Sequence, residues 1–224
     1  MGNYLIYDMQ IIDLTYDLEN NMITYSAPWH PKFLIEQLAT INKEGRETRK
    51  VTFGTHTGTH IDAPRHFIEN GGTVEKIPIS KLIGSVQIVD FSYLKEEESV
   101  TLDMIKSIKI SKKMIFKFGW GTKWGDMKFY NKYPFFTKEA AEYMVSQGVE
   151  LVGHDTPSPD ASYVISSKED SPVHKIFLKN NVILVEYIAN METIPDYDDW
   201  TIVVSPLRLK DADGSPARVF IYKE

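Results

Sequence analysis

The chain has 224 residues, of which 42% are hydrophobic, and this length and composition allow the full hydrophobic core of one α/β domain. The formal net charge is -6, and the sequence has no stripe of Lys and Arg that could neutralise a phosphate backbone. We therefore expect a small-molecule partner rather than a nucleic acid. The absence of cysteine excludes disulfides, thiolate metal sites, iron–sulfur clusters and a thiol nucleophile, and any metal must be held by histidines and carboxylates.

The beginning of the chain carries acidic residues and no basic region, which is not typical of a secretory signal, and no apolar run approaches the length of a membrane span. We therefore expect a cytoplasmic protein without a membrane partner. No internal repeat or linker-like tract interrupts the sequence, which predicts a single domain over residues 1–224.

The first third of the chain opens with a short apolar strand at residues 11–14. An irregular segment follows that holds Tyr25, Trp29 and two prolines and could line a pocket. Two β-prone runs, residues 34–41 and 48–55, then flank a Gly-containing turn, and we interpret them as a hairpin that leads the chain to His56. A helix over residues 33–43 is the competing interpretation.

The rest of the chain alternates helical and β-prone segments. Thr137 is a favourable N-cap for a helix that Gly148 ends, and Ser171 followed by Pro172 opens a second helix to about Lys179. Short apolar runs predict strands at residues 86–91, 114–118, 150–153, 182–188, 201–207 and 218–222. This alternation indicates an α/β fold with a mixed sheet flanked by helices.

Three histidines and one aspartate fall within eleven positions, at His56, His60, Asp62 and His66. The glycine and the β-branched threonines between the first two histidines disfavour a helix. In an extended chain with a period of two, His56, Gly58, His60 and Asp62 project to the same side and cluster as metal ligands, with Gly58 leaving room for an ion. The alternative is a loop that is rich in histidine only by chance and is exposed.

Two neutral imidazoles and a carboxylate suit zinc, manganese or iron(II), and they leave coordination positions free for water. Glu186 supports the same site, because an ionised carboxylate inside a Val/Ile/Leu strand is costly unless a cation compensates it. His174, near the start of the preceding helix, could approach the same centre. The alternative is that Glu186 faces solvent on an edge strand and His174 is an exposed helical residue.

The segment HTGTHIDAPRHF, residues 56–67, resembles the HxGTHxDxPxHF signature of the cyclase family of metal-dependent hydrolases, which includes bacterial kynurenine formamidase and isatin hydrolase. The likeness continues through Asp13-Leu14-Thr15, Gly153-His154-Asp155-Thr156-Pro157-Ser158-Pro159-Asp160, Pro172-Val173-His174 and Val185-Glu186. The resemblance implies a swivelling β/β/α fold and a homodimer or homotetramer.

The resemblance also implies roles for single residues. His56, His60 and Asp62 correspond to metal ligands, Asp62 could bridge to a second ion, and His174 and Glu186 would complete a two-metal site. His66 matches the catalytic acid/base of the family.

Positions around this set extend the comparison or depart from it. Tyr25 lies near the place of a substrate-stacking Trp in the formamidase, and Ser26 stands where a proline is expected. His154 stands where we expect a small apolar residue, and we interpret it as a core histidine or one that supports a ligand. Trp120 could wall the substrate pocket, with a core aromatic as the alternative.

These residues predict the hydrolysis of a small amide, formamide, cyclic imide or lactone by metal-activated water, with zinc or manganese as the metal. The resemblance implies two ions per site. An iron(II) oxygenase is the rival enzyme class, although a second carboxylate and His174 would close positions that an oxygenase leaves open. A non-catalytic, metal-stabilised binding protein is the remaining alternative, and in that case His66 would be dispensable.

Overall fold

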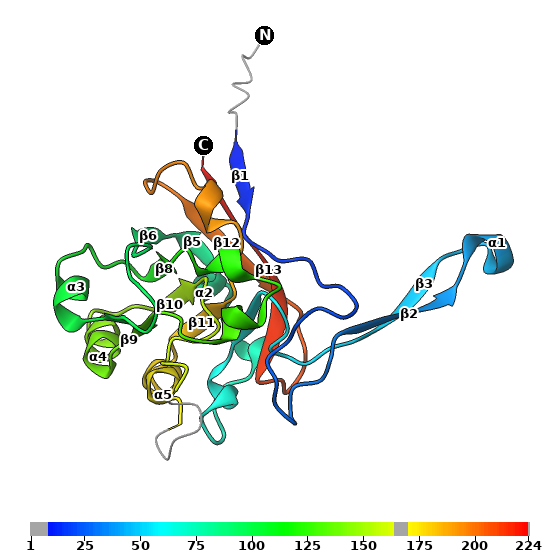
Figure 1. Ribbon diagram of the computed structural model, residues 1–224, viewed down its shortest axis with the longest axis horizontal. Coiled ribbons are helices and arrows are strands. Elements are labelled where there is room, and N and C mark those ends of the chain that lie inside the picture. The colour runs from blue at the N-terminus through cyan, green and yellow to red at the C-terminus, as the bar shows by residue number, and fades with distance from the viewer. Residues whose placement is uncertain (1–8, 164–169, 224) are drawn as a thin grey trace, which may run out of the picture.

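One curved, mixed sheet organises the computed structural model, which describes residues 9–163 and 170–223 (Figure 1). The strands follow the order β5-β12-β13-β4-β11-β10-β8-β6, and β1 also pairs with β13. Their bounds are β1 Gln10–Asp13, β4 His60–Asp62, β5 Ile83–Ser85, β6 Gln87–Asp90, β8 Lys113–Lys117, β10 Leu151–His154, β11 Ile183–Glu186, β12 Thr201–Pro206 and β13 Gly214–Lys223. The predicted α/β class with a mixed sheet is confirmed.

Strand direction divides the sheet into two parts. β6, β8, β10 and β11 are parallel neighbours, whereas β4 pairs antiparallel with both β11 and β13. The strands expected from apolar runs are present, with small shifts at their ends. The last strand begins at Gly214, four residues earlier than predicted. The prediction was too short because glycine and proline, present here as Gly214 and Pro216, usually argue against a strand.

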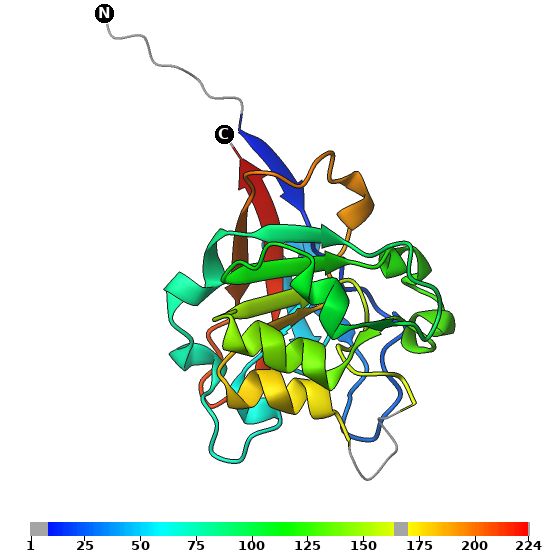
Figure 2. The same ribbon diagram turned by 90° about the vertical axis from the view of Figure 1, so that its left-hand side faces the viewer.

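Helices cover one face of the parallel strands, where α4 (Lys138–Ser146) and α5 (Pro172–Lys179) lie side by side, with α3 (Leu102–Lys106) beside α4 (Figure 2). The Thr137 hydroxyl accepts a hydrogen bond from the Ala140 amide, and Gly148 follows the helix at a φ of 80°, so the predicted ends of α4 are confirmed. Met144 and Phe177 of these helices pack against Phe116 of β8 in one core cluster.

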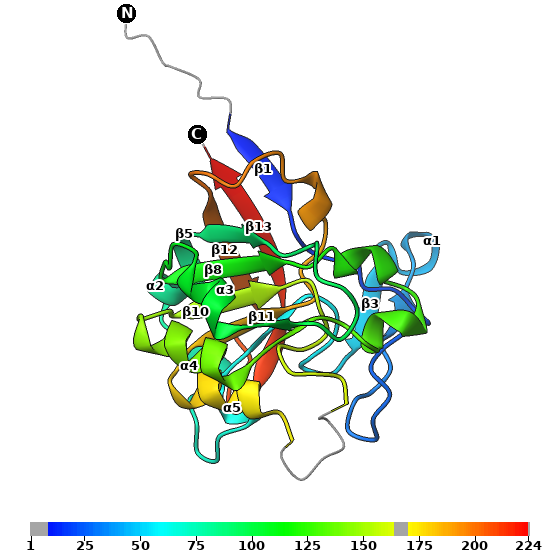
Figure 3. The same cartoon turned by 60° about the vertical axis from the view of Figure 1, so that its left-hand side comes forward.

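The opposite face of the same strands is also buried, because the sheet curves and brings β12 and β13 across it (Figure 3). Alternation along single strands divides the side chains between the two cores. On β8, Phe116 enters the helix-covered cluster and Ile115 enters the second one, where Ile202 and Val219 also pack. Burial on both faces explains why the parallel strands read as continuous apolar runs.

A hairpin arm projects from the body of the molecule (Figure 1). It consists of β2 (Leu34–Ala39) and β3 (Thr48–Thr52), with the one-turn helix α1 (Ile41–Glu44) at its tip. Gly45 ends α1 at a φ of 69°, which glycine adopts readily. The predicted hairpin is confirmed, and the competing helix over residues 33–43 is wrong.

The extended geometry expected for residues 56–62 is only partly correct. The strand covers His60–Asp62, whereas residues 56–59 form a turn in which Gly58 has a φ of 61°. A Cβ on Gly58 would lie 2.4 Å from Leu18 Cδ2, so this glycine serves the turn and the packing against Leu18 rather than space for an ion. The predicted cluster of His56, His60 and Asp62 is present, but His56 reaches it from a turn and not from the extended strand.

Short elements complete the described chain: α2 (Ile79–Leu82), the parallel pair β7 (Ser99–Val100) and β9 (Phe135–Phe136), and 3-10 turns at Pro64–His66, Val74–Lys76, Trp120–Lys123, Met127–Tyr130 and Met191–Thr193. Within the ranges described, no helix combines the length and apolar character needed to cross a bilayer. Residues 1–8, which carry most of the leader-peptide argument, lie outside the described ranges, and a single domain over residues 1–224 stays a prediction.

Candidate metal centre

Two buried carboxylates form the centre of the site and lie on neighbouring strands. β4 and β11 pair with His60 opposite Glu186, and because alternate residues of a strand share a face, His60, Asp62 and Glu186 lie on one side of the sheet. Asp62 is fully buried and Glu186 is 4% exposed. The acid inside the apolar strand is therefore buried as predicted, and its interpretation as a solvent-facing edge residue is wrong.

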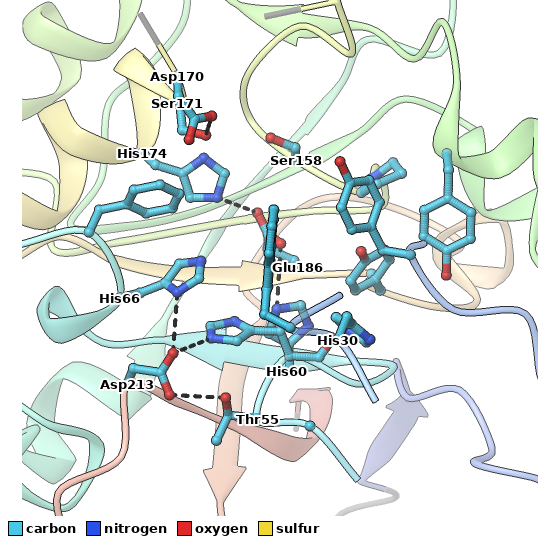
Figure 4. A pocket seen from close by; sticks show the side chains of 18 of the residues that line it. His30, Thr55, His60, His66, Ser158, Asp170, Ser171, His174, Glu186 and Asp213 are labelled. Carbon is cyan, nitrogen blue, oxygen red and sulfur yellow. Dashed lines mark hydrogen bonds and ion pairs between the residues drawn. The ribbon is translucent and has the colours of Figure 1, made fainter. Parts of the chain in front are cut away.

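The three predicted ligand histidines contact these carboxylates, and Figure 4 shows His60 and His174 beside Glu186. His60 Nε2 lies 3.3 Å from Asp62 Oδ1 and 3.5 Å from Glu186 Oε2. His174 Nε2 lies 3.5 Å from Asp62 Oδ2 and 3.1 Å from Glu186 Oε1. His56 Nδ1 lies 2.7 Å from Asp62 Oδ1. The fold thus brings together all five residues predicted to hold metal.

Each of these imidazoles has a ring nitrogen held by an acceptor outside the carboxylate pair. His60 Nδ1 donates to the Gly58 carbonyl at 2.7 Å, and His174 Nδ1 donates to Asp160 Oδ2 at 2.6 Å. His56 Nε2 donates to Asp213 Oδ2 at 2.8 Å. Such bonds fix the ring orientation and, in a neutral imidazole, leave the lone pair on the nitrogen that faces the carboxylates.

Asp160 also holds the beginning of α5. Ser171 occupies the N-cap position, as predicted, but its side chain makes no cap hydrogen bond. The amide groups of Val173 and His174 donate instead to the two carboxylate oxygens of Asp160, at 2.7 Å and 3.0 Å. One carboxylate therefore fixes both the helix end and the ring of His174.

The donor set fits a divalent cation. Within residues 9–163 and 170–223, His60 Nε2, Asp62 Oδ2 and Glu186 Oε1 are buried and find no hydrogen-bond partner. Each unsatisfied buried polar group costs about 1–3 kcal/mol, which a coordinated ion would remove. Metal–ligand bonds of about 2.0–2.2 Å place the ligand atoms of a tetrahedral site about 3.4 Å apart, close to the separations of 3.1–3.5 Å found here.

Electrostatics favour a cation at this centre. Burial alone would lower the pKa of His56, but the Asp62 and Asp213 carboxylates outweigh it and raise that pKa to about 10. Burial opposes protonation of His174 as well, and Asp160 and Glu186 reverse the effect and raise its pKa. Burial would raise the pKa of Asp62, whereas the neighbouring His56 and His66 hold it well below its ordinary value. Without a metal, protons take the place of cations among these carboxylates.

His66 lies beside the cluster, as the last residue of the 3-10 turn Pro64–His66, and its side chain is 27% exposed. Its Nδ1 donates to Asp213 Oδ2 at 3.3 Å, and its ring centre lies 3.8 Å from that of His56. In the described part of the chain no protein group hydrogen-bonds to His66 Nε2. The arrangement holds one ring nitrogen and leaves the other available to a bound molecule.

A cavity of about 500 Å³ opens onto this cluster. Tyr25, Tyr130, Tyr133 and Tyr187 give it an aromatic lining, and His66 also faces it. The Tyr25 and Tyr130 rings lie 6.1 Å apart at 54°. The irregular segment expected to line a pocket does so, through Tyr25 and the residues Trp29, His30 and Pro31.

Trp120 is not among the residues that line this cavity, so its predicted role in the pocket wall is wrong. The side chain is buried in the helix-covered core, 5% exposed, and its Nε1 donates to the Phe129 carbonyl at 2.8 Å. Its ring stacks edge-on toward Tyr133, and Lys123 Nζ lies 3.3 Å from its centre. The alternative interpretation of Trp120 as a core aromatic is confirmed.

Sequence reasoning missed Asp213 and His30. Asp213 accepts hydrogen bonds from both His56 and His66, and the next residue, Gly214, admits the His56 ring, because a Cβ there would lie 2.7 Å from His56 Cε1. His30 Nε2 donates to the His56 carbonyl at 2.8 Å. The run Asp-Ala-Asp-Gly-Ser-Pro, which leads into the last strand, was the available signal for Asp213, but this composition is typical of an ordinary turn.

Comparison with known proteins agrees with this geometry. The family model described as "Putative cyclase" matches residues 12–161. Kynurenine formamidases of Bacillus cytotoxicus and Bacillus anthracis are each 30% identical over 216 residues, covering 94% of this chain and 96% of theirs. An isatin hydrolase bound to the product analogue thioisatinate superposes with a TM-score of 0.87 at 22% identity, covering 96% of this chain and 93% of that one.

A further solved structure, described as a potential metal-dependent hydrolase with cyclase activity, has a TM-score of 0.79 at 25% identity over 96% of this chain and 98% of that one. Fold and site together define a metal-dependent hydrolase. The chain belongs to the cyclase family, and the fold implied by its sequence signature is confirmed.

Proposed function

We propose that this protein hydrolyses a small aryl amide or formamide, in the manner of a kynurenine formamidase, with a cyclic imide or lactone as the alternative substrate. The chain is an enzyme that acts on carbon–nitrogen bonds, the class of its formamidase relatives. One observation carries the substrate proposal: the cluster of candidate metal ligands lies at an aromatic cavity, beside the hydrogen-bonded pair of His66 and Asp213.

We assign His56, His60 and Asp62 to one ion and His174 and Glu186 to a second, with Asp62 between them. The contacts of Asp62 with all three histidines support this assignment. Zinc or manganese is the proposed metal, and two ions per site the proposed number. Divalent ions held there would lower the pKa of water from about 16 to about 7 and polarise a carbonyl group.

His66 would act as the acid/base. Its Nδ1–H is held by Asp213, so Nε2 carries the lone pair that takes a proton from the nucleophile and returns it to the leaving nitrogen. Asp213 orients the ring and stabilises the imidazolium that forms. The aromatic side chains of the cavity would pack against an aryl group and exclude water.

Paired substrates test this proposal. Protein loaded with Zn²⁺ or Mn²⁺ should prefer N-aryl over N-alkyl formamides of similar size by a larger factor than hydroxide ion does in solution, because the aryl group packs against the tyrosines as well as being the better leaving group. Tyr25→Leu should reduce this preference while leaving the amount of bound metal unchanged. Equal rates for both formamides, with faster hydrolysis of a cyclic imide or lactone, would support the alternative substrate. Turnover that requires iron(II) and oxygen would support the oxygenase, and bound metal without any turnover the binding protein.

We also propose a homodimer or homotetramer. The arm supports this proposal, because an isolated two-stranded hairpin is marginally stable in water and this one exposes Leu34, Leu38, Ile41 and Val51. Light scattering should give more than one chain per particle, and Leu38→Glu should lower that number if the arm lies in the contact. A cytoplasmic location and the lack of nucleic-acid and membrane partners stay predictions.

A further inference from the structure

His154 is a buried histidine beside the cluster that the assigned ligand set does not use. It ends β10, directly beside β11, and the two strands pair in parallel with Gly153 opposite Val185. His154 follows Gly153 and Glu186 follows Val185. The two side chains therefore lie on the same face of the sheet, at the carboxyl ends of two neighbouring strands. His154 is fully buried, and its Nε2 lies 3.7 Å from Glu186 Oε1.

The hydrogen bonds of the ring settle where its proton lies in the neutral form. His154 Nδ1 lies 3.0 Å from the Thr156 carbonyl, which can only accept a hydrogen bond. The Thr156 hydroxyl lies 2.9 Å from the same nitrogen and gives its own proton to the Ser158 carbonyl, so it also accepts. The proton is therefore on Nδ1, and Nε2 presents a lone pair.

Two electron-rich atoms thus face each other in the interior. Among the described residues, neither His154 Nε2 nor Glu186 Oε1 has a hydrogen-bond partner although both are buried, and the nearest ring nitrogen to Glu186 Oε1 is that of the assigned ligand His174, at 3.1 Å. His60 has the same arrangement, with Nδ1 bound to a backbone carbonyl and an unpartnered Nε2 close to a carboxylate oxygen. A cation between the two atoms would satisfy both, and their separation of 3.7 Å lies near the distance of about 3.4 Å between ligands of a tetrahedral ion.

We propose that His154, through Nε2, is a further ligand of the ion held by His174 and Glu186. The inference rests on the proposed function, since it presupposes that metal binds at this cluster. A further imidazole favours zinc over manganese for this ion, because nitrogen donors suit Zn²⁺ whereas Mn²⁺ prefers carboxylates and water.

The test counts coordinated imidazoles in the folded protein. Protein labelled with ¹⁵N-histidine and loaded with ¹¹³Cd²⁺ should show a cadmium–nitrogen coupling at His154 as well as at His56, His60 and His174. His154→Val should lose one cadmium–nitrogen coupling. Its affinity for one of the two ions should fall tenfold or more, and the fall should be larger for Zn²⁺ than for Mn²⁺. Leu151→Val is the matched control, because Leu151 is also fully buried on β10 but packs in the second core, away from the cluster, and the variant should keep all couplings.

The outcomes separate the two proposals. Wild-type protein that binds no cadmium or zinc would overturn the proposed function and this inference together. Normal metal binding with no coupling at His154, or with unchanged couplings and affinities in His154→Val, would overturn only the inference. His154→Gln replaces the valine variant if that one does not fold. If neither folds, the wild-type coupling is assigned to His154 through contacts with Phe136, whose ring centre lies 6.4 Å away.

Discussion

Asp213→Asn tests how the protein holds its acid/base. Asp213 Oδ2 accepts hydrogen bonds from His56 Nε2 at 2.8 Å and His66 Nδ1 at 3.3 Å, and its Oδ1 accepts from the Thr55 hydroxyl at 2.9 Å. An asparagine with its oxygen toward the histidines keeps all three hydrogen bonds, since its amide can donate to Thr55. The substitution therefore removes the negative charge and little else.

The expected effect follows from the difference between charged and neutral hydrogen bonds. A hydrogen bond to a charged group contributes about 1.5–3 kcal/mol and a neutral one about 0.5–1.5 kcal/mol. The Asp213 side chain is 36% exposed, so water screens its charge and the smaller difference applies. We expect a loss of about 1 kcal/mol in stabilisation of the protonated His66, which lowers kcat roughly 5-fold with little change in KM.

The assay is steady-state hydrolysis of an aryl formamide at saturating Zn²⁺, with bound metal measured in the same samples. Asp211→Asn is the matched control, because it removes the same charge from an exposed residue of the same loop and should change kcat less than twofold. A kcat for Asp213→Asn that equals that of Asp211→Asn would refute the positioning role of Asp213.

Three other predictions concern the ligands and the acid/base. His66→Ala should keep its metal and lose kcat by about a hundredfold or more; loss of metal in this variant would instead make His66 a ligand. Glu186→Gln should bind fewer ions and show a smaller rise in Tm on adding Zn²⁺, and unchanged stoichiometry and melting curves would contradict its assignment. Because carboxylates hold the pKa of His56 at about 10 against the effect of burial, Zn²⁺ affinity measured by chelator competition should rise with pH from about 6 to about 9, and a flat profile would contradict proton competition.

Local sequence signals predicted the elements of the fold well. Thr137 and Gly148 mark the ends of α4 because their preferences act within a few residues. The apolar runs at β8, β10 and β11 reflect burial on both faces of a parallel sheet, which sequence records directly. The curvature that brings β12 and β13 across the second core left no comparable local signal, because it depends on contacts between distant strands.

The candidate ligands could also be predicted, since a polar residue in an apolar element is costly wherever it lies. Glu186 inside its strand is the clearest case, and its contacts with His60 and His174 show what compensates it. Asp213 could not be found in this way, because an acid in a turn has no cost to explain until the fold places it against His56. Trp120 illustrates the opposite error, in which an aromatic suited to a pocket wall is equally suited to a core.

Metal occupancy and hydrolysis measured on the same samples test the central claim most directly. Protein freed of metal with a chelator and titrated with Zn²⁺ or Mn²⁺ should bind up to two ions per chain, and hydrolysis of an aryl formamide should rise with occupancy from a baseline near zero. The structural reason for this expectation is that the possible ligand atoms His60 Nε2, Asp62 Oδ2 and Glu186 Oε1 are buried without a hydrogen-bond partner among the described residues. Full hydrolysis by the metal-free protein, or no binding of either ion, would contradict it.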